Sequence, residues 1–185
     1  MAARRVAAAT LLGALLFAGA QLRAQHGLEY EVKAAYLYNI VNFVTWPPDA
    51  VSPASNPLRV CVFGDDPFGP LLNHAMDGGT AAMRPIVVDR LADIGATTMC
   101  DLVFVPGNST DRIDRVVRAT RQRPVLTVGE APDFLRRGGM IAFVVDGGRV
   151  RFDINLPAAT TRGLMLSSRL LQVARTIVGG RGQAG

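Results

Sequence analysis

Short apolar runs alternate along the chain with stretches of mixed apolar and polar residues. Between Leu28 and Trp46 the apolar side chains recur at helical spacing, which predicts a helix, and the two prolines after Trp46 are expected to end it. The runs rich in β-branched residues predict four strands, at Leu58–Phe63, Ile86–Asp89, Leu102–Val105 and Val125–Val128. Because helical stretches separate these strands, the sequence predicts a mainly parallel sheet that is covered on both faces.

Shorter helices are expected between the strands. Asp66 is a suitable N-cap residue, and Pro67 would then take the first helical position, where a missing N–H has no cost. A second helix is expected over Asp111–Thr120. A third, short helix is expected to end at Arg137, because Gly138-Gly139 follows it.

The C-terminal part of the chain has the pattern of a β-hairpin. Met140–Val145 and Arg149–Ile154 flank Asp146-Gly147-Gly148, and glycine supplies the positive φ that a tight turn needs. The small elements expected after it are helical turns at Pro157–Thr161, a short strand around Leu164 and Leu166, and a helix capped by Ser167 or Ser168 that runs through Ile177. Together these elements predict an α/β fold, a three-layer sandwich with a mainly parallel sheet of about five strands plus a C-terminal hairpin.

Residues 1–24 have the features of a secretory signal peptide. Arg4 and Arg5 form a positively charged start, an apolar run follows, and small residues allow cleavage after Ala20 or Ala24. The apolar run is shorter than the roughly 20 residues that span a bilayer, so we expect the signal to be removed and the mature protein not to insert into the membrane. An uncleaved membrane anchor is the alternative.

Removal of the signal changes the charge of the protein. Residues 1–24 contain three Arg and no acidic residue, so the formal net charge of +5 falls to +2 in the mature chain. A nearly neutral protein without a clustered basic patch is not expected to bind nucleic acid. The remainder suits a single α/β domain over residues 25–178, and the glycine-rich residues 179–185 are expected to form a disordered tail.

Cys61 and Cys100 are the only cysteines. Cys61 lies in the first expected strand and Cys100 directly precedes the third, and these two strands are often neighbours in a doubly wound sheet. In an oxidising compartment a disulfide is therefore expected, worth on the order of 4 kcal/mol, with two separate buried thiols as the alternative. A reactive thiol is not expected, because Val60 and Val62 place Cys61 in a core strand, where a thiolate is disfavoured.

No motif indicates a metal site, a cofactor site or a catalytic centre. His26 and His74 are far apart in the sequence, and no cysteine pair has the spacing of a zinc site. Gly64–Gly69 has the position of a phosphate-binding loop, but its two aspartates would repel an anion, and no Walker lysine or G-x-S-x-G elbow is present. We therefore expect a binding protein without a cofactor or a metal, not an enzyme. The alternative is a carboxylate pair for glycoside cleavage, drawn from Asp65, Asp66, Asp146 and Asp153.

Several segments resemble the signature motifs of the YfiR-like family. They are Lys33-Ala34-Ala35-Tyr36-Leu37-Tyr38-Asn39, Trp46-Pro47, Val60-Cys61-Val62-Phe63-Gly64, Pro67-Phe68-Gly69, Pro124-Val125-Leu126-Thr127-Val128, Gly138-Gly139-Met140-Ile141 and Val150-Arg151-Phe152-Asp153-Ile154-Asn155. The resemblance extends from about Glu29 to Val178, which is nearly the whole mature chain.

The resemblance implies a periplasmic protein that binds and represses the periplasmic sensor domain of an inner-membrane diguanylate cyclase. Its release under envelope or redox stress would raise cyclic di-GMP and promote biofilm formation. The family resemblance also implies a disulfide between Cys61 and Cys100, whereas a second bridge found in some members has no counterpart here. Members of the family can form dimers, so a homodimer is a further expectation.

Two regions are candidates for contact with the partner. Phe152 and Ile154 should alternate with the polar residues of their strand, so that only one of the two sets faces outward, and an edge strand without a partner is the alternative. Trp46 is expected either to be an exposed contact or to cover the core. The candidate partner-binding residues are Trp46, Arg151, Asp153 and Asn155.

The alternative function is a periplasmic sensor module that binds a small molecule. In α/β sheets such sites lie at the carboxyl ends of the strands. These ends are expected near Gly64, Pro106 and Gly129.

Overall fold

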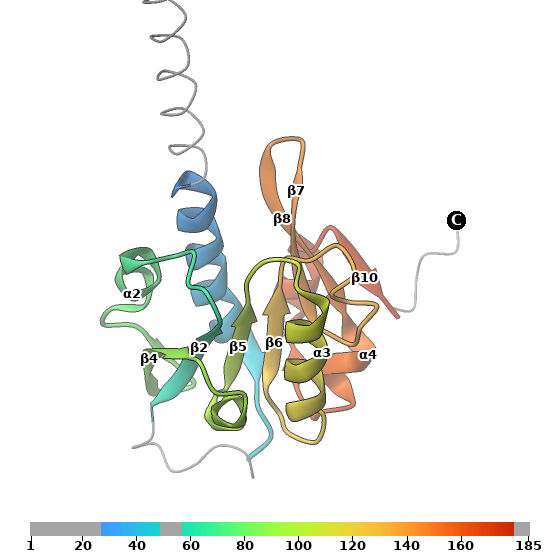
Figure 1. The fold of residues 1–185 in the computed structure, drawn as a ribbon, viewed down its shortest axis with the longest axis horizontal. Helices are drawn as coiled ribbons and strands as arrows, with labels where there is room; N and C mark the ends of the chain where they lie inside the picture. Colours follow the sequence, from blue (N-terminus) through green and yellow to red (C-terminus); the bar gives the residue numbers. More distant parts are fainter. Residues whose placement is uncertain (1–26, 49–56, 180–185) are drawn as a thin grey trace, which may run out of the picture.

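The computed structural model describes residues 27–48 and 57–179, and Figure 1 shows their arrangement. The first helix covers residues 27–42. The other helices are α2 (Pro70–Met76), the 3₁₀ helix η2 (Gly95–Met99), α3 (Thr110–Ala119), α4 (Leu156–Thr160) and α5 (Ser168–Val173). The strands are β1 (Val44–Thr45), β2 (Leu58–Phe63), β3 (Thr80–Ala81), β4 (Arg84–Leu91), β5 (Leu102–Val105), β6 (Leu126–Gly129), β7 (Ile141–Asp146), β8 (Arg149–Asn155), β9 (Met165–Leu166) and β10 (Thr176–Val178).

Within these residues, the main sheet has eight strands in the order β10-β8-β7-β6-β5-β2-β4-β3, and β1 pairs separately with β9. The five central strands, from β4 to β7 in this order, run parallel to their neighbours. Strand β8 is antiparallel to β7, and β3 is antiparallel to β4. The parallel centre and the C-terminal hairpin are thus confirmed. The sheet is larger and more mixed than predicted, because β3 and β10 extend it at its two edges.

Helices cover both faces of the sheet, because the side chains of each strand point alternately to one face and the other. In β2, Val60 and Val62 belong to the core beneath the first helix, α2, α4 and α5, whereas Cys61 and Phe63 belong to the core beneath α3. All four side chains are buried. The continuous apolar run of this strand therefore has the pattern expected of a parallel strand covered on both sides.

The first helix ends earlier than predicted. It stops at residue 42 rather than at Trp46, because Val44–Thr45 forms β1 and pairs antiparallel with β9. The backbone N–H of Ser167 also donates to the carbonyl oxygen of Phe43, at 2.9 Å. The end of the first helix is therefore set by the pairing of β1 with β9, two strands that are distant in the sequence.

Helix α2 begins later than predicted. The carboxylate of Asp66 accepts a hydrogen bond from the backbone N–H of Phe68 at 2.8 Å, which forms a turn and not a helix cap. Gly69, with φ of 53°, redirects the chain, and Pro70 takes the first helical position instead of Pro67. A proline occupies the first helical position, as predicted, but it is Pro70 and not Pro67.

The elements after β6 are partly as predicted. Strand β9 and α4 confirm the expected short strand and helical turns, and the Ser167 hydroxyl caps α5 by accepting from the N–H of Leu170. Residues 132–138 form turns and not a helix that ends at Arg137, because the buried ring of Phe134 packs against Gly129 and Gly139 and holds the segment in place. The last helix was also predicted too long: α5 ends at Val173, and β10 pairs with β8.

Candidate partner-binding groove

Two adjoining hollows lie beside β8, between the first helix, the β7–β8 hairpin and α5. Figure 1 shows this hairpin projecting beyond the body of the sheet. The first hollow, about 630 Å³, is lined among others by Leu28, Val32, Tyr36, Val145, Arg149, Val150 and Arg151. The second, about 700 Å³, is lined among others by Tyr36, Phe43, Arg151, Phe152, Leu170 and Val173. Tyr36 and Arg151 line both hollows, so the two hollows form one groove, which we call the β8 groove.

Apolar side chains of the β8 groove are open to solvent. Leu28, Val145 and Val173 are 62%, 57% and 59% exposed. At the base of the groove, the ring of Tyr36 packs edge-on against Phe152, with 5.5 Å between the ring centroids. Apolar surface that gathers in one concave place is typical of a site for another protein.

The rim of the β8 groove carries a positive charge. Arg149 and Arg151 are exposed, and neither side chain has a hydrogen bond or an ion pair in the described part of the chain. The acidic residue at the rim, Glu29, is bound by the ammonium of Lys33. The rim is therefore complementary to an acidic partner.

Strand β8 alternates as predicted. Phe152 and Ile154 are buried in the core, at 1% and 0% exposure, whereas the side chain of Arg151 faces outward. Asp153 accepts two hydrogen bonds from the guanidinium of Arg175, which ties β8 to the start of β10. Of the described polar residues on this strand, Arg149 and Arg151 line the groove with unpaired charges, and Arg151 lines both of its hollows.

The side chain of Asn155 holds two elements together. Its carbonyl oxygen accepts from the N–H of Ala158 at 3.1 Å and caps α4. Its amide nitrogen donates to the carbonyl oxygen of Leu135, also at 3.1 Å. Both polar ends of the side chain are thus used inside the fold.

Trp46 covers the core. Only 5% of the residue is exposed, and its indole N–H donates to the backbone carbonyl oxygen of Asp101 at 3.3 Å. Of the two alternatives predicted for this residue, the geometry favours the core and leaves little surface for a partner.

The sequence did not single out the apolar residues of the β8 groove. Leu28 and Val32 follow the same helical spacing as the buried residues of the first helix. At the end of β7, Val145 shares a face with the buried Ile141 and Phe143, as the period of two requires. The local pattern therefore gave no signal that this side chain is exposed.

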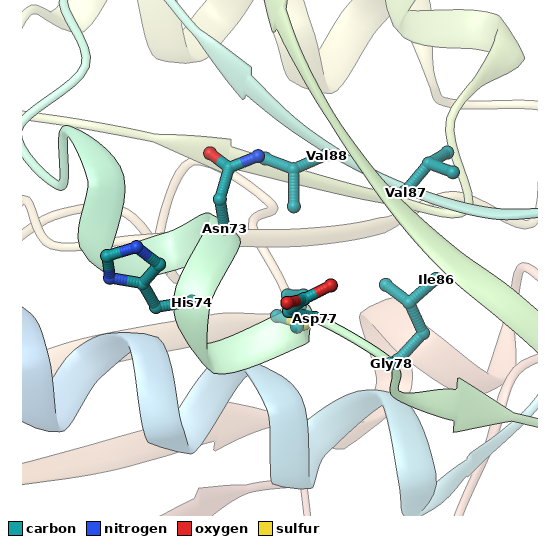
Figure 2. Close-up of a pocket in the computed structure, with 8 residues that line it drawn as sticks. Asn73, His74, Asp77, Gly78, Ile86, Val87 and Val88 are labelled. Atoms are coloured by element: carbon teal, nitrogen blue, oxygen red, sulfur yellow. The ribbon is translucent and has the colours of Figure 1, made fainter.

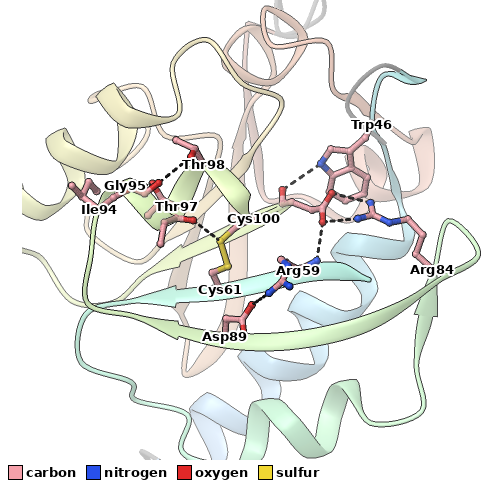
Figure 3. Close-up of a disulfide and its surroundings, with 12 residues drawn as sticks. Trp46, Arg59, Cys61, Arg84, Asp89, Ile94, Gly95, Thr97, Thr98 and Cys100 are labelled. Carbon is pink, nitrogen blue, oxygen red and sulfur yellow. Dashed lines mark hydrogen bonds and ion pairs between the residues drawn. A yellow bond between two sulfur atoms is a disulfide. The ribbon is translucent and has the colours of Figure 1, made fainter. Parts of the chain in front are cut away.

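The expected disulfide joins Cys61 to Cys100, whose Cα atoms are 6.1 Å apart. Figure 3 shows it beside a buried ion pair. The guanidinium of Arg84 donates to both carboxylate oxygens of Asp101, at 2.9 and 3.0 Å, and the backbone N–H of Arg59 donates to the same carboxylate at 2.8 Å. The bridge and the ion pair together fix the start of β5 against β2 and β4.

The carboxyl ends of β2 and β5 are filled by the protein's own side chains. The guanidinium of Arg112 lies against Gly64. It donates to the carbonyl oxygen of Pro106 at 3.3 Å and to the carboxylate of Asp65 at 3.2 Å. This packing gives no support to a ligand site at these two strand ends.

Glu130, which follows β6, is the centre of a polar cluster. Its carboxylate accepts hydrogen bonds from the ammonium of Lys33 (2.7 Å), the N–H of Gly107 (2.6 Å) and the hydroxyl of Tyr30 (3.1 Å). Lys33 is only 3% exposed. Burial, and then the charge of Glu130, raises the pKa of Tyr30 well above its ordinary value, so the hydroxyl remains a hydrogen-bond donor. The cluster anchors the first helix to the end of the sheet beyond Gly129.

A smaller hollow of about 400 Å³ lies between α2 and β4 (Figure 2). Asn73, His74 and Asp77 line it on one side, and Val87 and Val88 on the other. Among the described residues, no group of three or more His, Cys, Asp or Glu side chains is placed to bind a metal. In the same residues, no helix combines the length and the apolar character needed to cross a membrane.

A sequence model of a known family matches residues 30–175, and its description is YfiR/HmsC-like. The chain belongs to the YfiR/HmsC-like family. The family is regulatory rather than enzymatic and is associated with periplasmic control of cyclic di-GMP signalling. The resemblance noted in the sequence is therefore confirmed.

Two solved structures share the fold. A conserved domain protein from Vibrio cholerae O1 biovar El Tor strain N16961 is 16% identical with a TM-score of 0.51, and the match covers 66% of this chain and 55% of that one. An ABC domain in complex with L-Trp from Streptococcus pneumoniae is 11% identical with a TM-score of 0.54, and the match covers 78% and 60%. This chain thus spans less than two thirds of either protein, and the likeness concerns the fold alone.

Proposed function

We propose that this protein binds and represses the periplasmic sensor domain of an inner-membrane diguanylate cyclase, and thereby controls cyclic di-GMP and biofilm formation. Family membership over residues 30–175 is the observation that carries the proposal. The β8 groove supports it, because its exposed apolar side chains and unpaired arginines suit a protein partner. We further propose that residues 1–24 are a cleaved signal, which delivers the chain to the periplasm.

The proposal is tested by expressing the chain together with a membrane-anchored diguanylate cyclase of the same organism that has a periplasmic sensor domain, and measuring cyclic di-GMP. The full chain should lower the nucleotide level several-fold. A chain without residues 1–24 should remain inside the cell and have no effect, because it cannot reach the sensor domain. A cyclase that lacks its periplasmic domain should not respond to the full chain. An unchanged nucleotide level with the full chain would contradict the proposal.

A small-molecule sensor is the competing function. A ligand that binds only the folded protein raises its melting temperature, so a thermal-shift screen of periplasmic metabolites separates the two proposals. We expect the purified sensor domain to raise the melting temperature of the protein and the metabolites to leave it unchanged. A metabolite that raises it while the sensor domain does not would favour the alternative.

A further inference from the structure

Strand β8 is paired along its whole length on one side only. On the side of β7 the pairing extends from Arg149 to Ile154. On the other side β10 pairs with Asp153–Asn155 alone. Among the described residues, no strand lies beside Arg149–Phe152 on that second side. This half of β8 is therefore a free edge, and it borders the β8 groove.

The backbone groups at this edge have a defined direction. The N–H of Asn155 donates toward β7, to the carbonyl oxygen of Met140, whereas the carbonyl oxygen of Phe152 accepts from the N–H of Arg175 on the other side. Successive residues of a strand direct their N–H and C=O groups to opposite sides. The N–H and C=O of Val150 and the N–H of Phe152 therefore point to the free edge. Such groups are a template for another strand.

From these observations we propose that an extended, acidic segment of the partner adds to the free edge of β8 as a further strand. The inference rests on the proposed function, since it specifies how the sensor domain binds. The added strand hydrogen-bonds to Val150 and Phe152. Its apolar side chains cover Leu28 and Val145 in the β8 groove.

The charges at the edge select the occupant. Arg149 and Arg151 flank Val150, and acidic side chains on the added strand pair with them. A second copy of this chain fits less well. If two β8 strands paired antiparallel about Val150, Arg149 of one copy would face Arg151 of the other, and like charges directly opposite are destabilising. A strand of opposite charge from a different protein is therefore the occupant.

The test compares proline substitutions at two open edges of the same sheet. Val150→Pro removes an N–H that points to the free edge of β8 and leaves the pairing with β7 intact. Val88→Pro is the matched control on β4. The N–H of Ile86 donates away from β2, to Gly79, and the carbonyl oxygen of Leu91 accepts from Gly64 on the side of β2, so Val88 also faces outward. Binding of the purified periplasmic sensor domain is measured by calorimetry.

Charge reversal provides a second pair of variants. Arg151→Glu changes the rim of the groove, and Arg118→Glu is its control. Arg118 is an exposed residue of α3, and its side chain has no ion pair in the described part of the chain. Circular dichroism and melting curves of all four variants establish that they are folded.

We expect Val150→Pro and Arg151→Glu to weaken binding at least tenfold, and both controls to remain within twofold of the original protein. The amide of Val150 should exchange its hydrogen at least tenfold more slowly in the complex. If Val150→Pro does not fold, the inference is tested by hydrogen exchange at the Val150 amide in the complex and by the affinity of Arg151→Glu for the sensor domain. Normal binding by Arg151→Glu together with an unprotected Val150 amide overturns the inference.

Two further outcomes separate the inference from the proposed function. If the sensor domain binds Val150→Pro as tightly as the original protein, strand addition is wrong and the proposed function stands. If the sensor domain does not bind the original protein, the proposed function fails and the inference falls with it. A dimer of this chain that Val150→Pro dissociates, measured by light scattering, would make a second copy the occupant and also overturn the inference.

Discussion

The disulfide between Cys61 and Cys100 allows a quantitative prediction about stability. The perturbation is reduction of the bridge, which keeps every other atom of the protein and opens a loop between residues 39 apart in sequence. In the chain-entropy model a bridge stabilises the fold because it restricts the unfolded chain. The expected effect therefore follows from the loop length.

For a loop of this length, the chain-entropy relation gives a loss of about 4 kcal/mol in the free energy of unfolding at 25 °C. With a urea dependence of about 2 kcal/mol per molar, typical of a domain of this size, the unfolding midpoint should fall by about 2 M. Because Cys61 is fully buried and Cys100 is 6% exposed, the reductant should reach the bridge mainly through opened molecules. Reduction should therefore become faster as urea is added.

The assay is equilibrium unfolding in urea, followed by the fluorescence of Trp46, with and without a phosphine reductant. The double variant Cys61→Ala and Cys100→Ala is the control, because its midpoint should not depend on the reductant. A thiol assay establishes that the bridge is open in the reduced sample. A midpoint that falls by less than about 0.5 M, which corresponds to about 1 kcal/mol, would refute the loop argument.

Three further predictions concern single side chains. Arg84→Ala should lower the free energy of unfolding by about 3–5 kcal/mol in urea titrations, because it leaves the buried carboxylate of Asp101 without its bidentate partner. The pKa of Tyr30 is raised above its unfolded value of 10.0, so its contribution to stability is complete below pH 10 and is lost as the pH rises beyond it. Melting temperatures above pH 10 should therefore fall less steeply in Tyr30→Phe. Gly129→Ala should destabilise by about 1–3 kcal/mol, because the added methyl group would lie 2.5 Å from the ring of Phe134, and Phe134→Leu should relieve part of that loss.

The centre of the fold was predictable because its strands are buried on both faces. Leu102–Val105 is an uninterrupted apolar run, and the structure has a strand with the same bounds. The edges of the sheet were not predictable in this way. Thr80–Ala81 and Thr176–Val178 are too short to have a periodicity of their own, and pairing with β4 and β8 makes them strands.

The candidate groove was predictable only in part. Strict alternation around Phe152 identified Arg151 as an outward residue, and the structure confirms that orientation. Nothing in a local pattern distinguishes an apolar side chain on a helix that faces the core from one that faces a groove. Leu28, Val32 and Tyr36 recur at a spacing of four and therefore share one face of the first helix. Only the position of the β7–β8 hairpin makes that face one side of a groove.

The link between the first helix and Glu130 has a consequence for the order in which the molecule is assembled. Tyr30 and Lys33 form hydrogen bonds with Glu130, which lies 100 and 97 residues further along the chain. Strand β1 likewise can pair only after β9 is present. If the chain is exported from its N-terminus, as proposed, this helix crosses the membrane long before its binding place exists. The chain would then remain unfolded during most of its passage, and folding would be completed only when the last third has arrived.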